Sequence, residues 1–342
     1  MLCLHVNTMR VTNVQIREKI KLLDSLIDTY NENTVHAKRD FAKYENSYEK
    51  RLREAISFFQ KYIPQAISLT TFSNKSKLGR PEKLTLEQRV KILLIQRLVY
   101  RSNREMSNML LLFSFLTNVD ISYKTVERLY DDSRIQLILF NMNSLINKEL
   151  NLTESDCCGD ATGYVLSVKE HYASSAQKLK DKGKKSTKKR KVLFSFALLD
   201  INKRIYLAFG TSYQSEKDAY NKAIEMLKKT NIELKSVRLD RYYSGQTIVK
   251  NMSVMFPGIK CYLIPKKNVT IRGSFEWKKM LHNFCLNTEE YFEEYFKRNQ
   301  SESGFSEDKK RFGWKIPQKL SNRADLAYNS IFTWHNLMWV GQ

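Results

Sequence analysis

The apolar residues of the chain change their spacing near residue 157. Before that point they recur every three or four positions, which is the period of an α-helix with one buried face. Two such stripes are formed by Ile16, Ile20, Leu23 and Ile27, and by Leu52, Ile56, Phe59 and Ile63. After it, short runs rich in β-branched and aromatic residues alternate with helical stretches, which indicates strands connected by helices. The chain therefore divides into a helical first part and an α/β second part.

The helical part divides again at a polar stretch. Pro64 and the sequence SNKSKLGRP at 73–81 interrupt the helical period, so we expect a linker there. It separates an N-terminal helical region, 1–75, from a second helical unit, 76–150. The first region carries no catalytic pattern. It can be a helical hairpin that packs on itself or on a partner, or an element that binds DNA ends or dimerises.

The second helical unit contains three short helices with tight turns. Thr85 and Gln88 have the spacing of a capping box at the start of the first helix, and Ser122 is expected to cap the third. This arrangement is typical of a helix-turn-helix unit, although many trihelical units do not touch DNA. The residues expected to point outward from the third helix are Lys124, Thr125 and Arg128.

The α/β part, 151–342, has a characteristic order of elements. Three strands come first, with a tight turn between the second and the third, and then helix, strand, helix, strand and helix follow. This order predicts a ribonuclease H-like mixed sheet flanked by helices. Cys157 and Cys158 are expected to be small buried residues in the first strand, with a redox pair as the less favoured alternative.

The charge balance predicts a polyanionic partner. Lys and Arg number 58 against 36 Asp and Glu, which leaves a formal charge of +22. Nucleic acid is the first candidate and an anionic membrane surface the second. No apolar run is long enough to span a bilayer, and the first residues lack the pattern of a secretion signal. We therefore expect a cytoplasmic, nucleoid-associated protein with double-stranded DNA as partner, without a membrane or a small-molecule substrate.

Three carboxylates can converge in the predicted sheet. Asp160 lies in CCGDATGY at the start of the first predicted strand, and Asp240 ends the fourth in VRLDRYYSG. These strands are neighbours in a ribonuclease H-like sheet, and Glu302 can reach the same point from a helix laid across it. Their hard oxygen atoms suit Mg²⁺ or Mn²⁺, which would neutralise their mutual repulsion. Two such ions can activate the attacking oxygen and stabilise the leaving oxygen of a phosphodiester.

Other polar residues have less specific surroundings. Asp156 is expected at a cap or turn, Asp200 in a hairpin turn and Asp218 at a helix start. His335 is expected to be a structural histidine. Trp277 and Trp314 could stack on a displaced base, although aromatic residues of the core are commoner. The acidic neighbours of Glu302 are expected on a solvated helix face, namely Glu289, Glu290, Glu293, Glu294 and Glu307.

The segment around Glu302 resembles a known signature. Tyr295, Arg298, Glu302 and Lys309 have the spacing Y-x2-R-x3-E-x6-K, which is similar to the pattern around the catalytic Glu of the DDE transposases of bacterial and archaeal insertion sequences. The sequences DATGY and LDRYYSG likewise resemble the surroundings of the two catalytic Asp residues in that family. The resemblance covers residues 157–315.

The resemblance implies roles for these residues. Asp160, Asp240 and Glu302 would be catalytic and would bind two Mg²⁺ or Mn²⁺ ions, while the Tyr, Arg and Lys of the signature would contact DNA. The signature spacing puts its four side chains on one helical face if the helix continues. Gly304 weakens a helix and could place Lys309 on a loop.

Basic segments predict the path of the DNA. Gly79-Arg80-Pro81 resembles the core of an AT-hook, which inserts Arg into a narrow minor groove, although a plain linker turn is as compatible. The stretch 178–191 is strongly basic and can track the DNA backbone or form a solvated loop. The residues expected to contact DNA are Arg80, Lys124, Arg128, Lys184, Lys185, Lys188, Lys189, Arg190, Tyr295, Arg298 and Lys309.

The sequence thus predicts a transposase. It would cut the ends of a mobile element and join the exposed 3′-OH to target DNA, as a homodimer on DNA and with no covalent enzyme–DNA intermediate through Tyr242 or Tyr243. A metal-dependent nuclease of the same fold is one alternative. A domesticated DNA-binding regulator without catalysis is the other.

Overall fold

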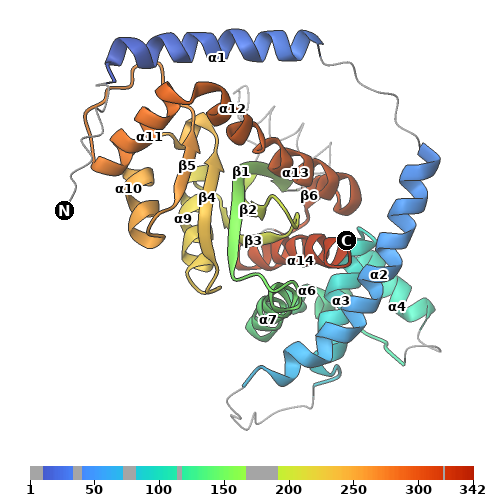
Figure 1. Ribbon diagram of the computed structural model, residues 1–342. Coiled ribbons are helices and arrows are strands. Elements are labelled where there is room, and N and C mark those ends of the chain that lie inside the picture. Colours follow the sequence, from blue (N-terminus) through green and yellow to red (C-terminus); the bar gives the residue numbers. More distant parts are fainter. Residues whose placement is uncertain (1–10, 34–40, 72–81, 114–117, 167–191, 319) are drawn as a thin grey trace, which may run out of the picture.

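The structure is a computed structural model that describes residues 11–33, 41–71, 82–113, 118–166, 192–318 and 320–342. Its centre is a six-stranded mixed sheet with helices on both sides (Figure 1). The prediction of an α/β protein whose mixed sheet is flanked by helices is therefore confirmed. None of the helices within these ranges is both long and apolar enough to cross a membrane.

The sheet is built around one long strand. β1 (Glu154–Leu166) lies in the middle of the order β3-β2-β1-β4-β5. β2 (Val192–Asp200) and β3 (Tyr206–Ser212) continue from it as antiparallel neighbours. On its other side β4 (Glu233–Leu239) and β5 (Lys260–Leu263) run parallel to it. A short strand, β6 (Lys315–Ile316), pairs with the end of β1.

The structure confirms the predicted role of Asp200 and contradicts that of Asp156. Asp200 does form the tight turn between β2 and β3, because its carboxylate accepts hydrogen bonds from the backbone N–H groups of Asn202 and Lys203. The prediction of a cap or turn at Asp156 is wrong. Asp156 lies within β1 beside an irregularity in the pairing with β4, and its carboxylate accepts a hydrogen bond from Ser236.

Alternate side chains of the strands enter two separate cores. Cys157 and Phe196 belong to the core on one face, which also contains α9 (Glu216–Leu227), α10 (Gln246–Met255), α11 (Phe275–Leu286) and α12 (Thr288–Phe296). Cys158 and Ala197 belong to the core on the other face, with α13 (Asn299–Phe312) and α14 (Ser321–Trp339). Both cysteines are fully buried, as predicted. The alternation follows from the two-residue period of a β-strand.

The predicted apolar faces of the two N-terminal helices agree with the structure to different degrees. In α1 (Asn13–Asn33) the predicted apolar face is buried and packs beside α11. α2 (Phe41–Ser68) continues through Pro64, so the predicted break at this residue is wrong, and within the predicted stripe Ile56 is exposed whereas Phe59 and Ile63 are buried. Burial against α7 (Ser133–Glu149) and α14 outweighs the backbone hydrogen bond that Pro64 cannot donate. The residues of α2 that are buried are Ala55, Phe59, Tyr62, Ile63 and Ala66.

The three predicted short helices are present as α3 (Leu86–Leu98), α4 (Asn103–Leu112) and α6 (Tyr123–Leu129). The capping box of Thr85 and Gln88 is confirmed. Ser122 occupies the N-cap position of α6, as predicted, but its hydroxyl lies 3.3 Å from the hydroxyl of Thr125 and makes no capping bond to a backbone N–H. These helices share one apolar core with α14 and the sheet. The division into domains at residues 75 and 150 stays a prediction.

Candidate active site

Asp160 and Asp240 lie side by side where β1 and β4 stop pairing. The last paired residues of these parallel strands are Gly159 and Leu239, so each aspartate is the next residue of its chain segment. Neighbouring strands are about 4.8 Å apart, which brings the two aspartates into one site. Asp160 lies inside β1, not at its start as predicted, because β1 continues beyond β4 in its pairing with β2.

Gly159 allows this close packing beside the aspartates. A Cβ atom at this position would lie 2.6 Å from the ring of Phe196 and 2.9 Å from a methyl group of Leu239. These distances are shorter than ordinary van der Waals contact. A larger residue would therefore have to displace the buried side chains of Phe196 and Leu239 beside Asp160 and Asp240.

Glu302 comes to the same site from the first turn of α13. The helix continues through Gly304 to Phe312, so Glu302 and Lys309 lie on one helix. Gly304 is buried, and a Cβ atom there would lie 3.1 Å from the hydroxyl oxygen of Tyr206. The glycine thus serves the close packing of α13 on the sheet. The side chain of Glu302 is 53% exposed, so its carboxylate is accessible from solvent.

A buried polar cluster holds α13 in place behind the site. Asp308 of α13 accepts a hydrogen bond from the Tyr206 hydroxyl at 2.8 Å, and its other carboxylate oxygen lies 2.8 Å from Nδ1 of His335. Nε2 of His335 lies 2.9 Å from the carbonyl oxygen of Arg204. His335 is therefore a structural histidine with both ring nitrogens engaged, as predicted. Because Asp308 and Glu302 lie on the same helix, this cluster also fixes the backbone position from which the Glu302 side chain extends.

Arg298 joins the acidic residues to one another. Its guanidinium lies 2.9 Å from the carboxylate of Asp160 and 2.7 Å from that of Glu302. Tyr295 is buried at the end of α12, with the Arg298 guanidinium 5.9 Å from its ring. The expected single helical face is wrong, because α12 ends at Phe296 and α13 begins at Asn299. Arg298 in the turn between them still reaches both carboxylates.

The pKa values of Asp160 and Arg298 are shifted by burial and by the neighbouring charges. Burial raises the pKa of the Asp160 carboxyl to about 6, and the negative charges of Glu302 and Asp240 add to the rise. The charge of Arg298 and a 2.8 Å hydrogen bond from the backbone N–H of Ala161 act against it. Burial alone would lower the pKa of Arg298, but the neighbouring negative groups raise it. The raised pKa of Asp160 is therefore mainly a result of burial, and Arg298 is the cation that opposes the rise.

Lys309 lies on the β1 side of the same helix. Its ammonium donates a hydrogen bond to the hydroxyl of Thr162, two residues after Asp160, and lies 5.2 Å from the ring centre of Trp314. Burial lowers the pKa of Lys309. Trp314 is 59% exposed, so it is not a core residue, whereas Trp277 is buried and donates its ring N–H to the carbonyl of Thr270.

A cavity of about 420 Å³ opens at this site. Asp240, Arg298 and Glu302 line it together with Asp24 and Arg241. Across the described residues, no three acidic, histidine or cysteine side chains are grouped closely enough to hold a metal ion as they stand. The guanidinium of Arg298 lies between Asp160 and Glu302, where it supplies the positive charge.

The other predicted DNA contacts are distributed over the chain. Lys124 and Arg128 are exposed on α6, where Lys124 pairs with Glu127 at 2.8 Å. The remaining basic candidates lie outside the described residues, namely Arg80, Lys184, Lys185, Lys188, Lys189 and Arg190. Sequence reasoning missed Asp24 and Arg241. The position of Arg241 directly after Asp240 was an available signal, but nothing local marks Asp24.

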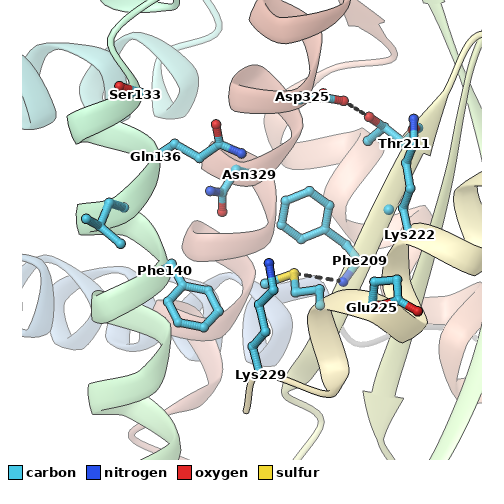
Figure 2. Close-up of a pocket in the computed structure, with 13 residues that line it drawn as sticks. Ser133, Gln136, Phe140, Phe209, Thr211, Lys222, Glu225, Lys229, Asp325 and Asn329 are labelled. Carbon is cyan, nitrogen blue, oxygen red and sulfur yellow. Dashed lines mark hydrogen bonds between the residues drawn. The ribbon is translucent and has the colours of Figure 1, made fainter.

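A second cavity, of about 530 Å³, lies apart from the carboxylates between α7, α9 and α14 (Figure 2). Asp325 accepts a hydrogen bond from Thr211 at one end of it. Asn329 lies near its centre, and its side-chain oxygen has no hydrogen-bond partner among the described residues. None of the three candidate catalytic carboxylates lines this cavity, so it is not the candidate active site.

The fold and the site define an α/β protein whose acidic residues converge at the end of a central parallel strand pair. The chain is 35% identical over 331 residues to a probable transposase for an insertion sequence element of Archaeoglobus fulgidus. The match covers 97% of this chain and 97% of that protein. The chain therefore belongs to the insertion-sequence transposases. No protein-family model matches it.

Proposed function

We propose that the chain is a DDE transposase that cuts the ends of an insertion sequence and joins the 3′-OH to target DNA. The observation that carries this proposal is the arrangement of three carboxylates. Asp160 and Asp240 follow the last paired residues of neighbouring strands β1 and β4, and Arg298 pairs with both Asp160 and Glu302 of α13. The strand order, with two antiparallel and two parallel neighbours around β1, is compatible with a ribonuclease H-like fold. Membership of the transposase family supports the reaction class and DNA as the partner.

The chemistry of the three carboxylates fits divalent metal ions. All the donor atoms are hard oxygens, and the raised pKa of Asp160 reflects its burial, a cost that a bound cation would offset. We propose that Asp160, Asp240 and Glu302 hold two Mg²⁺ or Mn²⁺ ions in exchange for the guanidinium of Arg298. Bound ions supply activation of the attacking oxygen and stabilisation of the leaving oxygen in an in-line displacement.

The neighbouring cations would then position the substrate. Arg298, released from the carboxylates, can donate two parallel hydrogen bonds to a phosphate. Lys309 lies on the same helix as Glu302 and reaches the β1 side of the site. Tyr295 is buried and limits the directions that Arg298 can take, so we assign it a positioning role. Because phosphate contacts carry no sequence information, recognition of the element ends has to come from elsewhere.

The helical unit of α3, α4 and α6 is the proposed reader of the element ends. Lys124 and Arg128 are exposed on α6, and Glu127 of the same helix is tied to α14 by Arg323. That tie gives a DNA-reading helix a fixed position relative to the catalytic site. Joining two ends in one reaction further requires two copies of the chain on DNA, acting where the DNA lies, in the cytoplasm at the nucleoid.

A strand-transfer assay tests the proposal. The purified chain is incubated with Mg²⁺, pre-cleaved ends of its own element and a circular target. Joined products that disappear in Asp160→Asn are expected. Hydrolysis products alone would favour a nuclease of the same fold. If Asp160→Asn kept the full biological activity, the chain would instead be a DNA-binding regulator.

A further inference from the structure

Asp24 of α1 places a carboxylate against two cations at the edge of the active-site cavity. One of its oxygens lies 3.2 Å from the guanidinium of Arg241, and the other lies 3.9 Å from the ammonium of Lys267. Arg241 directly follows Asp240, and Asp24 and Arg241 line the same cavity as Asp240 and Glu302. An acidic residue of the N-terminal helix thus faces basic residues beside the candidate catalytic carboxylates.

The position of α1 does not depend on this ion pair. The helix is attached by its buried apolar face, in which Ile16 and Leu23 are fully buried. In addition, Asn13 accepts a hydrogen bond of 2.8 Å from the backbone N–H of Ile271. Figure 1 shows α1 lying along the side of the molecule formed by α11 and α12. A partly exposed ion pair adds little to such packing, so stability alone gives no reason for an acid at this position.

The three charged side chains remain accessible to a ligand. The side chain of Asp24 is 39% exposed, that of Arg241 33% and that of Lys267 79%. A carboxylate and a phosphodiester both present two oxygen atoms to a guanidinium and an ammonium. The pair of cations is therefore suited to a backbone phosphate, and Asp24 has the charge and shape to take its place.

We propose that Arg241 and Lys267 bind a DNA backbone phosphate beside Asp240, and that Asp24 occupies this phosphate site until DNA enters. The inference rests on the proposed function and adds a substrate contact to it. Binding exchanges one anion for another at the two cations and involves no covalent step. Once displaced, Asp24 is an uncompensated negative charge near the phosphate, so the wild-type chain binds DNA more weakly than one with a neutral residue there.

The test is a DNA titration of the full chain without divalent metal. Fluorescence anisotropy of a labelled duplex is measured over a series of salt concentrations for the wild type and for Asp24→Asn. We expect about threefold to fivefold tighter binding, because the variant no longer has to break the ion pair or tolerate the nearby repulsion. The dependence of log affinity on log salt should steepen by about one, since no cation is taken up to neutralise Asp24.

Glu18→Gln is the matched control. Glu18 lies on the exposed side of α1, so this variant makes the same change in net charge outside the cavity. It should leave the salt dependence unchanged. Arg241→Gln should weaken binding, and Asp24→Asn added to the double variant Arg241→Gln, Lys267→Gln should have no larger effect than Glu18→Gln. Lys267→Gln provides the same cycle with a more exposed residue if Arg241→Gln lowers the melting temperature.

The results separate this inference from the proposed function. Equal effects of Asp24→Asn and Glu18→Gln, or a full Asp24→Asn effect in the absence of both cations, would overturn the phosphate site while leaving the transposase intact. A wild-type chain that bound no DNA at any salt concentration would contradict the proposed function itself.

Discussion

Asp160 should make the metal-free protein less stable as the pH rises. Burial holds the pKa of its carboxyl at about 6 in the folded chain, against 3.8 as the ordinary value. A folded-state pKa above the unfolded one means that the group contributes its full stability below pH 3.8 and loses it as the pH rises through 6. One pH unit corresponds to about 1.4 kcal/mol, so the loss is on the order of 3 kcal/mol by pH 7.5.

Asp160→Asn removes this titration and keeps the shape of the side chain. The free energy of unfolding in urea, with chelator present, is measured for the wild type and the variant between pH 4 and pH 7.5. Groups away from the site titrate alike in both proteins, so the difference reports on Asp160 together with its neighbours Glu302 and Asp240. It should grow in favour of the variant by roughly 1–3 kcal/mol over this range.

A control and a second condition complete the experiment. Asp120→Asn, at an exposed carboxylate, should show no such growth with pH. Mn²⁺ at pH 7.5 should stabilise the wild type more than Asp160→Asn, since the variant lacks one oxygen ligand with a full charge. A constant difference between wild type and Asp160→Asn across the pH range would refute the reasoning that burial raises the pKa of Asp160 in the folded chain.

Three further predictions concern the surroundings of the site. Replacing Arg298 by Ala removes the cation between two carboxylates, so Mn²⁺ should bind several-fold more tightly in calorimetry while DNA cleavage falls; an unchanged metal affinity would contradict the exchange. Gly313→Ala puts a side chain at φ +87° and a Cβ atom 2.0 Å from the ring of Tyr100, so the free energy of unfolding should drop by at least about 2 kcal/mol. A drop below half of that would show that the exposed Tyr100 ring moves aside and that the backbone at residue 313 accepts a side chain without strain. Alanine at both Lys124 and Arg128 should weaken binding to element ends and reduce its salt dependence by about one per lost phosphate contact, with no change in melting temperature.

Local patterns predicted what depends on local physics. The three strands, the alternating helices and strands, the capping box of Thr85 and the turn at Asp200 all follow from neighbouring residues. The predictions failed where distant packing outweighed those patterns. α2 runs through Pro64 because the face of the helix that does not carry Pro64 packs against α7 and α14. Ile56 is exposed because it lies on the side of α2 that faces away from these two helices.

The candidate carboxylates could be named from the sequence, but their arrangement could not. Asp160 and Asp240 stand in short sequences that mark a strand and a strand end, and Glu302 stands in a spaced signature. That Arg298 would lie between two of them depends on the turn between α12 and α13 and on the docking of α13 through Asp308. The pair of Arg298 with Asp160 and the bond of Tyr206 to Asp308 join residues far apart in the chain, which no local spacing encodes.

The sequence by itself therefore determined the order of the elements, the positive charge and the residues that can carry the chemistry. Each of these depends on residue type and on neighbours along the chain. The tertiary structure decided the register that sets Asp160 beside Asp240, the cation shared by the carboxylates and the placement of Asp24 at their cavity. The physical reason is that strand register and helix docking are selected by the packing of two complete cores, which exist once the whole chain has folded.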